Sequence, residues 1–180
     1  SFPTRPLFRS AHPQLDVVVT FAVEPYLLGW FQKTYEQARL CVMHQASSLI
    51  EGVFSYLKAE RLEASPRLFV AAEAEHVHIT VIKKAMLRYY NRFSYSNSDE
   101  FLQYILIVMH TLDLDPSVTK VILGGNVTKK SLAYRKACNY IPKVIFNDSP
   151  THLKFRRAFK KSIITNYFDL LSAHLPQELP

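Results

Sequence analysis

The chain has 180 residues, a formal net charge of +7 and a hydrophobic fraction of 48%. This composition is that of a globular protein and excludes a disordered tail, and no apolar run approaches the roughly 18 to 20 residues that cross a bilayer. The first ten residues, SFPTRPLFRS, lack the apolar segment of a signal peptide. We therefore expect a cytoplasmic protein without membrane insertion.

The first 65 residues predict strands that alternate with helices. An apolar, β-branched run predicts a strand over 15–23, and Pro25 is suited to the first turn of a helix that continues to 37. A second strand is predicted over 38–44 and a second helix over 46–64, with Ser48 as the expected cap. The order βαβα is typical of a parallel sheet.

From residue 67 the pattern changes to three strands in succession. The runs 67–72, 76–82 and 86–95 are joined by short connections, which favour an antiparallel meander. A helix over 98–112 follows, with Asn97 or Ser98 as its cap. A strand at 120–125, a helix at 131–140, a strand at 143–147 and a helix at 162–175 complete the order βββαβαβα. This order is the topology of a ribonuclease-H-like unit.

Four segments carry a resemblance to a known family: MLRYYNRFSYSNSDEFLQYILIVMHTLDLDP, VILGGN, YIPKVIFNDSP and NYFDLLSAHL. The chain resembles an uncharacterised Bacteroidetes family, a domain-of-unknown-function group that is similar to the actin, Hsp70 and sugar kinase superfamily. The resemblance implies an α/β, actin-like ATPase fold in two parts. Residues 1–65 would be the C-terminal part of a first lobe whose N-terminal part is missing, and 66–180 would be a complete second lobe.

The same resemblance implies a nucleotide site that has lost its phosphate-binding residues. The superfamily holds ATP between hairpins with an aspartate and a glycine, and here Ala71 or Ala72 occupies the aspartate position and Glu73 or Ala74 the glycine position. A glutamate adds negative charge where phosphates need donors. The segment Gly124-Gly125-Asn126 stands where adenosine would bind, although a plain turn is the favoured explanation of the two glycines.

Three other groups of residues are candidates for binding sites, metal ligands or reduced thiols. Arg156, Arg157, Lys160 and Lys161 would share one face of a helix, which either binds nucleic acid or an acidic protein or is simply solvated. His76 and His78 alternate on a strand without a third ligand, so we expect a polar sheet face and no metal. Cys41 and Cys138 are expected to be reduced core thiols.

No catalytic motif is recognisable, so the interpretation as an enzyme is weaker than that as a non-catalytic protein. No catalytic residue is assigned. The leading interpretation is a pseudo-ATPase: a non-catalytic or nucleotide-regulated interaction or scaffold protein with a protein partner or a second copy of itself. The alternative is a protein that binds nucleic acid or ribosomes through the basic face. No cofactor is assigned beyond a remnant ATP site.

Overall fold

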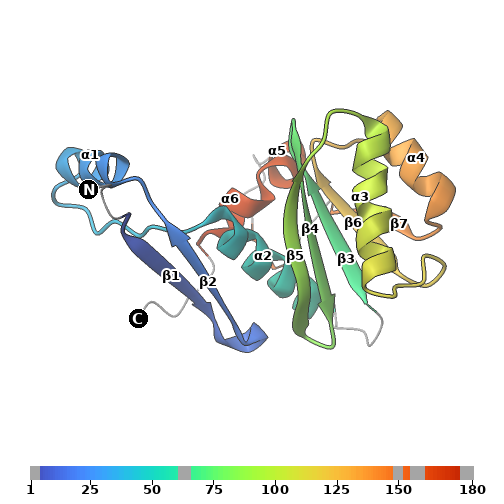
Figure 1. Cartoon of the computed structure of the whole chain (residues 1–180), viewed down its shortest axis with the longest axis horizontal. Helices are drawn as coiled ribbons and strands as arrows, with labels where there is room; N and C mark the ends of the chain where they lie inside the picture. The colour runs from blue at the N-terminus through green and yellow to red at the C-terminus, as the bar shows by residue number, and fades with distance from the viewer. Residues whose placement is uncertain (1–4, 61–65, 148–151, 155–160, 175–180) are drawn as a thin grey trace.

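The computed structural model describes residues 5–60, 66–147, 152–154 and 161–174, without the side chains of 161, 162 and 164. A five-stranded sheet with helices on both faces forms the main body, and a two-stranded hairpin with one helix projects from it (Figure 1). No helix in the described part of the chain is long and apolar enough to cross a membrane.

The central sheet has the strand order β5-β4-β3-β6-β7. Its strands are β3 (Arg67–Ala72), β4 (His76–Lys83), β5 (Met86–Ser94), β6 (Lys120–Gly125) and β7 (Val144–Phe146). β3, β4 and β5 form an antiparallel meander, whereas β6 pairs with β3, and β7 with β6, in parallel. The predicted meander with its parallel extension is thus confirmed.

Two helices cover one face of the sheet. They are α3 (Ser98–Thr111) and α4 (Leu132–Tyr140). The i, i+4, i+7 spacing of Phe101, Ile105 and Val108 lays one apolar stripe of α3 on the sheet, where all three are buried. Asn97 caps α3 as predicted, because its side-chain oxygen accepts hydrogen bonds from the amides of Asp99 and Glu100.

The opposite face is covered by α2 (Gln45–Ala59) and α6 (Phe168–Ser172), while α5 (Lys161–Asn166) precedes α6 (Figure 1). Leu49, Ile50 and Val53 of α2 pack with Phe69 of β3 and Phe168 of α6 in a second apolar core. The single final helix that the sequence predicts is therefore two short helices, interrupted at Tyr167.

The N-terminal part differs most from its prediction. β1 (Leu7–His12) was not predicted, and it pairs antiparallel with β2 (Val17–Ala22) across the 3-10 turn η1 (Pro13–Leu15). The predicted strand over 38–44 is irregular, because Leu40, Cys41, Val42 and Met43 instead line a hollow against α1. The order before residue 60 is therefore ββαα, and the prediction of βαβα was wrong.

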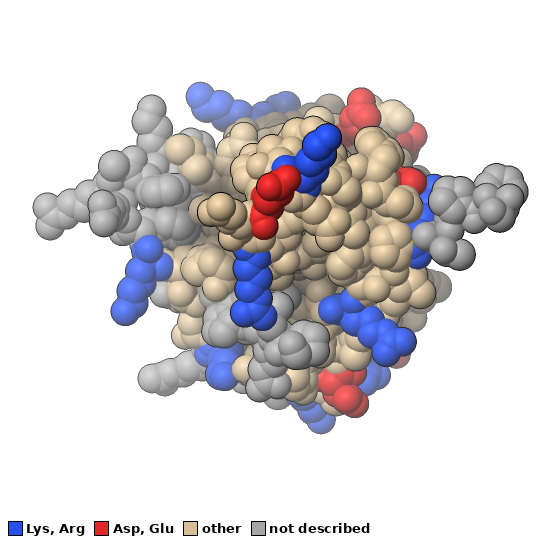
Figure 2. Space-filling view, turned by 90° about the vertical axis from the view of Figure 1, so that its left-hand side faces the viewer, with Lys and Arg blue, Asp and Glu red and all other residues tan. Residues whose placement is uncertain are grey.

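The helix α1 (Pro25–Thr34) lies at the far end of the projecting part and buries none of its residues (Figure 1). Tyr26 and Trp30 are 78% and 55% exposed. Figure 2 views the molecule from this side, where lysine and arginine are dispersed among acidic residues around a broad uncharged area. This side therefore presents uncharged surface more than concentrated positive charge.

The predicted boundary at residue 65 remains a prediction. The helix α2 precedes that boundary in sequence but packs on the sheet that follows it.

Candidate functional site

The candidate site lies where β3 and β6 end at the carboxyl edge of the sheet. Ala72 and Gly125 are paired there as the last residues of the two strands. The first turns of α2 and α6 come over this edge and enclose a small cavity of about 30 Å³. Its lining comprises Gln45, Leu49, Phe69, Ala71, Ala72, Glu73, His78, Gly124, Gly125, Thr165, Asn166, Phe168 and Asp169. Ligands of open α/β sheets characteristically bind at this edge.

The two glycines of the predicted adenosine segment have different roles. Gly125 has a φ of +80°, and a Cβ atom there would lie 1.9 Å from the carbonyl oxygen of Ala72. The amide of Asn126 donates a 2.8 Å hydrogen bond to the same oxygen, which ties the end of β6 to β3. A Cβ atom at Gly124 would meet Phe69 at an ordinary 3.6 Å. Gly125 is therefore required by the turn, whereas Gly124 is not required by backbone geometry.

Two of the three residues predicted to bind nucleotide, Gly124 and Gly125, line the cavity. Asn126 is exposed and is not one of the lining residues. The adenosine role of this segment stays a prediction.

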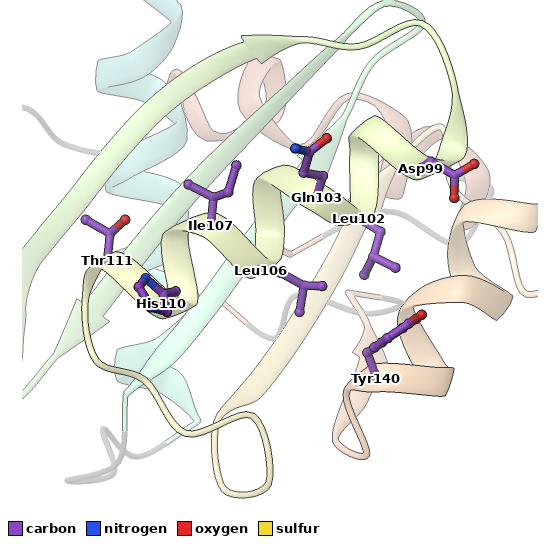
Figure 3. A pocket seen from close by; sticks show the side chains of 8 residues that line it. All are labelled: Asp99, Leu102, Gln103, Leu106, Ile107, His110, Thr111 and Tyr140. Atoms are coloured by element: carbon purple, nitrogen blue, oxygen red, sulfur yellow. The ribbon is translucent and has the colours of Figure 1, made fainter.

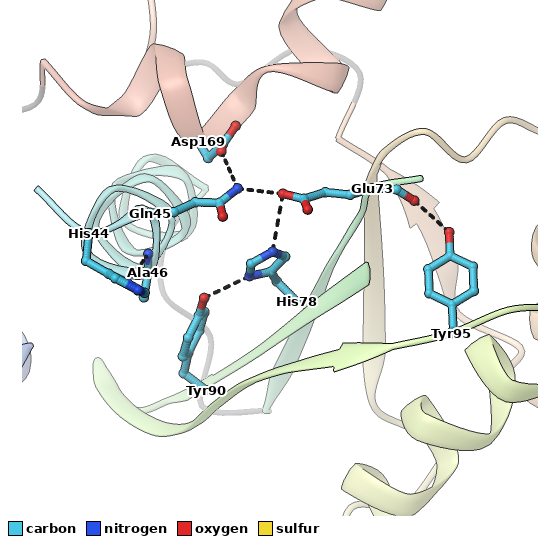
Figure 4. A network of polar contacts seen from close by, with 8 residues as sticks. All are labelled: His44, Gln45, Ala46, Glu73, His78, Tyr90, Tyr95 and Asp169. Atoms are coloured by element: carbon cyan, nitrogen blue, oxygen red, sulfur yellow. Dashed lines mark hydrogen bonds and ion pairs between the residues drawn. The ribbon is translucent and has the colours of Figure 1, made fainter. Parts of the chain in front are cut away.

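Two carboxylates meet on one amide at the mouth of the cavity (Figure 4). Gln45, the first residue of α2, donates from Nε2 to Glu73 Oε1 at 2.5 Å and to Asp169 Oδ2 at 2.8 Å. Glu73 belongs to the β3–β4 turn, which is closed by a hydrogen bond from its own amide to the carbonyl of His76. The turn at the predicted phosphate position thus presents an acidic side chain, and no lysine or arginine is among the lining residues.

His78 and Tyr90 extend the network beneath these carboxylates. Tyr90 Oη lies 2.8 Å from His78 Nδ1, and the other ring nitrogen, Nε2, lies 3.3 Å from Glu73 Oε1. Burial lowers the pKa of His78 more than the Glu73 carboxylate raises it, and burial raises the pKa of Tyr90 to about 12. Both side chains are therefore neutral near pH 7.

Because His78 is neutral, its contact with Glu73 is not an ion pair. A neutral imidazole forms no ion pair, and the 3.3 Å approach lacks the geometry of a hydrogen bond. Nε2 of this 2% exposed residue therefore has no hydrogen-bond partner within the described ranges.

The cavity is too small for a nucleotide in this conformation. A volume of about 30 Å³ holds one water molecule, whereas pockets for cofactors measure about 300–1,000 Å³. Phe168 and Asp169 of α6, together with Gln45 of α2, fill the space above the two glycines. Binding of a base or a phosphate here would require these two helix ends to move.

Several sequence interpretations change at this site. His78 is buried beneath α2 and does not lie on a solvated polar face, because α2 covers the side of β4 that the alternation marked as polar. Among the described residues, no group of three or more His, Cys, Asp or Glu side chains is placed to hold a metal ion. Ser48 is not the cap of α2: His44 caps it through Nδ1, and Ser48 Oγ donates to the backbone carbonyl of Asp169.

The sequence analysis missed Gln45 and Asp169 as site residues. Gln45 and Asp169 are 124 positions apart: Gln45 begins the 15-residue helix α2, and Asp169 lies in the first turn of the five-residue helix α6, with no motif around either residue. Glu73 was singled out, because it departs from the resemblance at the hairpin.

The predictions for the two cysteines and for the basic face concern residues outside this site. Cys41 and Cys138 are both free thiols, but both are exposed, so the prediction of core positions was wrong. The residues Arg156, Arg157 and Lys160 and the side chain of Lys161 lie outside the described residues, so the basic face stays a prediction.

A second and larger hollow, of about 430 Å³, lies along α3 on the other face of the sheet (Figure 3). Leu102 and Leu106 form part of its wall, and Tyr140 of α4 faces them. Its one carboxylate, Asp99, is held by Lys136 at 2.5 Å. This hollow offers apolar contact and no convergence of polar groups comparable with that around Gln45.

Comparison with known proteins agrees with this fold. The chain is similar to a crystal structure of a Bacteroides thetaiotaomicron protein with an actin-like ATPase fold and unknown function, with a TM-score of 0.74 and 17% identity. The similarity covers 96% of this chain and 59% of that one, so the chain spans about three fifths of its neighbour. No curated protein matches the sequence.

The fold is therefore the α/β, actin-like ATPase fold that the sequence predicts. Residues 3–144 match the family described as "Protein of unknown function (DUF3822)". The chain belongs to this family.

Proposed function

We propose that this chain belongs to a non-catalytic interaction or scaffold protein with an actin-like fold and a degenerate phosphate site. The observation that carries the proposal is the pair of carboxylates, Glu73 and Asp169, that meet on Gln45 where the fold would receive phosphates.

Electrostatics opposes a phosphate group at this position. A phosphate oxygen about 4 Å from one carboxylate is repelled by about 4 kcal/mol at an effective dielectric constant of about 20. Two carboxylates act together here, and the lining residues supply no lysine or arginine in compensation. Charge and the closed cavity thus support the same proposal.

Calorimetry with ATP and magnesium tests the proposal on the protein at its full natural length. We expect no binding tighter than about 1 mM and no phosphate release above background. The double variant Glu73→Gln/Asp169→Asn should bind ATP more tightly if the carboxylates exclude it. Micromolar binding by the wild type, with phosphate release above background, would falsify the non-catalytic role.

Binding of nucleic acid or ribosomes remains the alternative. It rests on the net charge of +7 and on the segment that contains Arg156, Arg157, Lys160 and Lys161. An RNA oligonucleotide in the same calorimeter at low salt separates the two functions, because such binding weakens steeply as salt is added.

A further inference from the structure

The side-chain amide of Gln45 bridges two carboxylates. Its Nε2 atom donates to two carboxylates that come from different elements, Glu73 after β3 and Asp169 in α6. The amide is neutral, so both negative charges remain uncompensated by any described residue of the cavity lining. Two carboxylates that converge on one N–H donor form a natural receptor for a positively charged donor.

A second observation points to the same kind of ligand. His78 lines the cavity, is 2% exposed, and has no hydrogen-bond partner for Nε2 among the residues that the structure describes. Tyr90 engages the other nitrogen, Nδ1, so the ring is held in this orientation (Figure 4). In the tautomer whose Nδ1 donates to Tyr90 Oη, Nε2 accepts a hydrogen bond from a donor placed between His78 and Glu73.

The remaining walls suit a flat, weakly hydrated group. Leu49, Phe69 and Phe168 supply apolar surface, with the Phe69 and Phe168 rings stacked at a centroid distance of 5.1 Å. For a guanidinium to enter, the exposed side chain of Gln45 would turn away and give up its volume, because the cavity of about 30 Å³ alone holds one water molecule. A guanidinium group presents five N–H donors in one plane, which matches several acceptors that converge from different directions.

We propose that this site binds the guanidinium group of an arginine side chain presented by a partner protein, which takes the place of the Gln45 amide between Glu73 and Asp169. The inference rests on the proposed interaction function and names the chemistry of the partner. An ammonium group carries the same charge but has fewer donors in a fixed plane, so lysine should bind more weakly.

Titration with N-acetyl-L-arginine amide tests the proposal by calorimetry and by chemical-shift changes of the His78 ring. We expect binding in the millimolar range. N-acetyl-L-citrulline amide, which has nearly the same shape and no charge, should bind at least tenfold more weakly. Equal binding of the two compounds, or binding of neither, overturns the proposal.

Variants locate the binding. Glu73→Gln and Asp169→Asn should each weaken binding of the arginine compound about tenfold, and Gln45→Ala should strengthen it several-fold by removing the competing amide. Glu75→Gln is the matched control, because Glu75 is an exposed acid of the same turn and makes the same change in charge. Circular dichroism establishes that each variant is folded. Weakening by Glu75→Gln equal to that by Glu73→Gln would show attraction by net charge and overturn the site.

The outcomes separate this inference from the proposed function. Failure of the arginine compound to bind overturns the inference and leaves a non-catalytic interaction protein standing. ATP hydrolysis overturns the proposed function, whereas the citrulline comparison still decides the arginine site.

Discussion

Gly125 shows how one residue shapes the carboxyl edge of the sheet. Its positive φ turns the chain out of β6, and the carbonyl oxygen of Ala72 occupies the space where a side chain would begin. The same oxygen accepts from the amide of Asn126. Backbone geometry and packing therefore both select glycine, independently of any ligand.

Substitution of the two adjacent glycines should have unequal effects. Gly125→Ala places a methyl group against backbone at a positive φ, so we expect the free energy of unfolding to fall by about 2 kcal/mol or more. Gly124→Ala should change it by less than about 1 kcal/mol, because its Cβ meets only ordinary contacts. Urea unfolding of the two variants measures the difference. Equal losses of unfolding free energy in the two variants would contradict the inference that the turn requires glycine at 125 but not at 124.

At the scale of elements, the contact between α2 and α6 holds the site together. α2 carries Gln45 and α6 carries Asp169, so their separation sets the distance between the two carboxylates. Gly52 faces α6, and a Cβ atom there would lie 2.2 Å from Ser172 Oγ and 2.7 Å from Ser172 Cβ. Ser172 is fully buried and its hydroxyl donates to the carbonyl of Phe168, so it has little freedom to move.

Gly52→Ala should therefore destabilise the protein in spite of the better helix propensity of alanine. Overpacking costs about 1–3 kcal/mol, against a gain of about 1 kcal/mol from propensity. We expect a net loss of up to about 2 kcal/mol in unfolding free energy and faster amide exchange in α6. In a Ser172→Gly background, where the obstructing side chain is absent, the same change should be neutral or stabilising. Loss of equal size in both backgrounds would contradict the close contact.

At the scale of the whole molecule, buried neutral histidines link stability to pH. His152 lies between the rings of Tyr56 and Phe168, and burial, with the nearby His174, lowers its pKa to about 4. Burial also lowers the pKa of His78. The unfolded chain binds a proton at each position near pH 6.5, whereas the folded chain does not. The contribution of each histidine to stability is therefore present above about pH 6.5 and falls as the pH is lowered, for His152 down to about pH 4.

His152→Phe should reduce this acid sensitivity. The neighbours of His152 are aromatic, and both its ring nitrogens are buried without a hydrogen-bond partner in the described part of the chain, so phenylalanine removes no bond. We expect the free energy of unfolding to fall less between pH 7.5 and pH 5 in the variant than in the wild type. Urea titrations at the two pH values measure this. An equal decrease in the free energy of unfolding in both proteins would show that the acid sensitivity comes from other groups, such as His78.

The sequence by itself determined the order of elements from residue 67 to β7, whereas the single helix predicted after β7 is α5 and α6. Strand alternation, the Asn97 cap and the apolar stripe of α3 are local signals, and each acts within a few residues. Before residue 60 local signals predicted β2, α1 and α2, but they missed β1 and predicted a strand over 38–44 that does not form. The apolar run at 40–43 packs on α1 without forming a strand, because strand formation depends on a neighbouring strand as well as on composition.

Only the tertiary structure decided the candidate site. The resemblance drew attention to Glu73, and the glycine pair marked the sheet edge, but Gln45 and Asp169 reach that edge on helices from opposite ends of the chain. Their meeting depends on how closely α2 and α6 pack, which the glycine at 52 permits. Periodicity describes which side of an element is buried. It does not say which distant side chain packs against that side. Here the packing of α2 against α6 brings two carboxylates, Glu73 and Asp169, to the amide of Gln45.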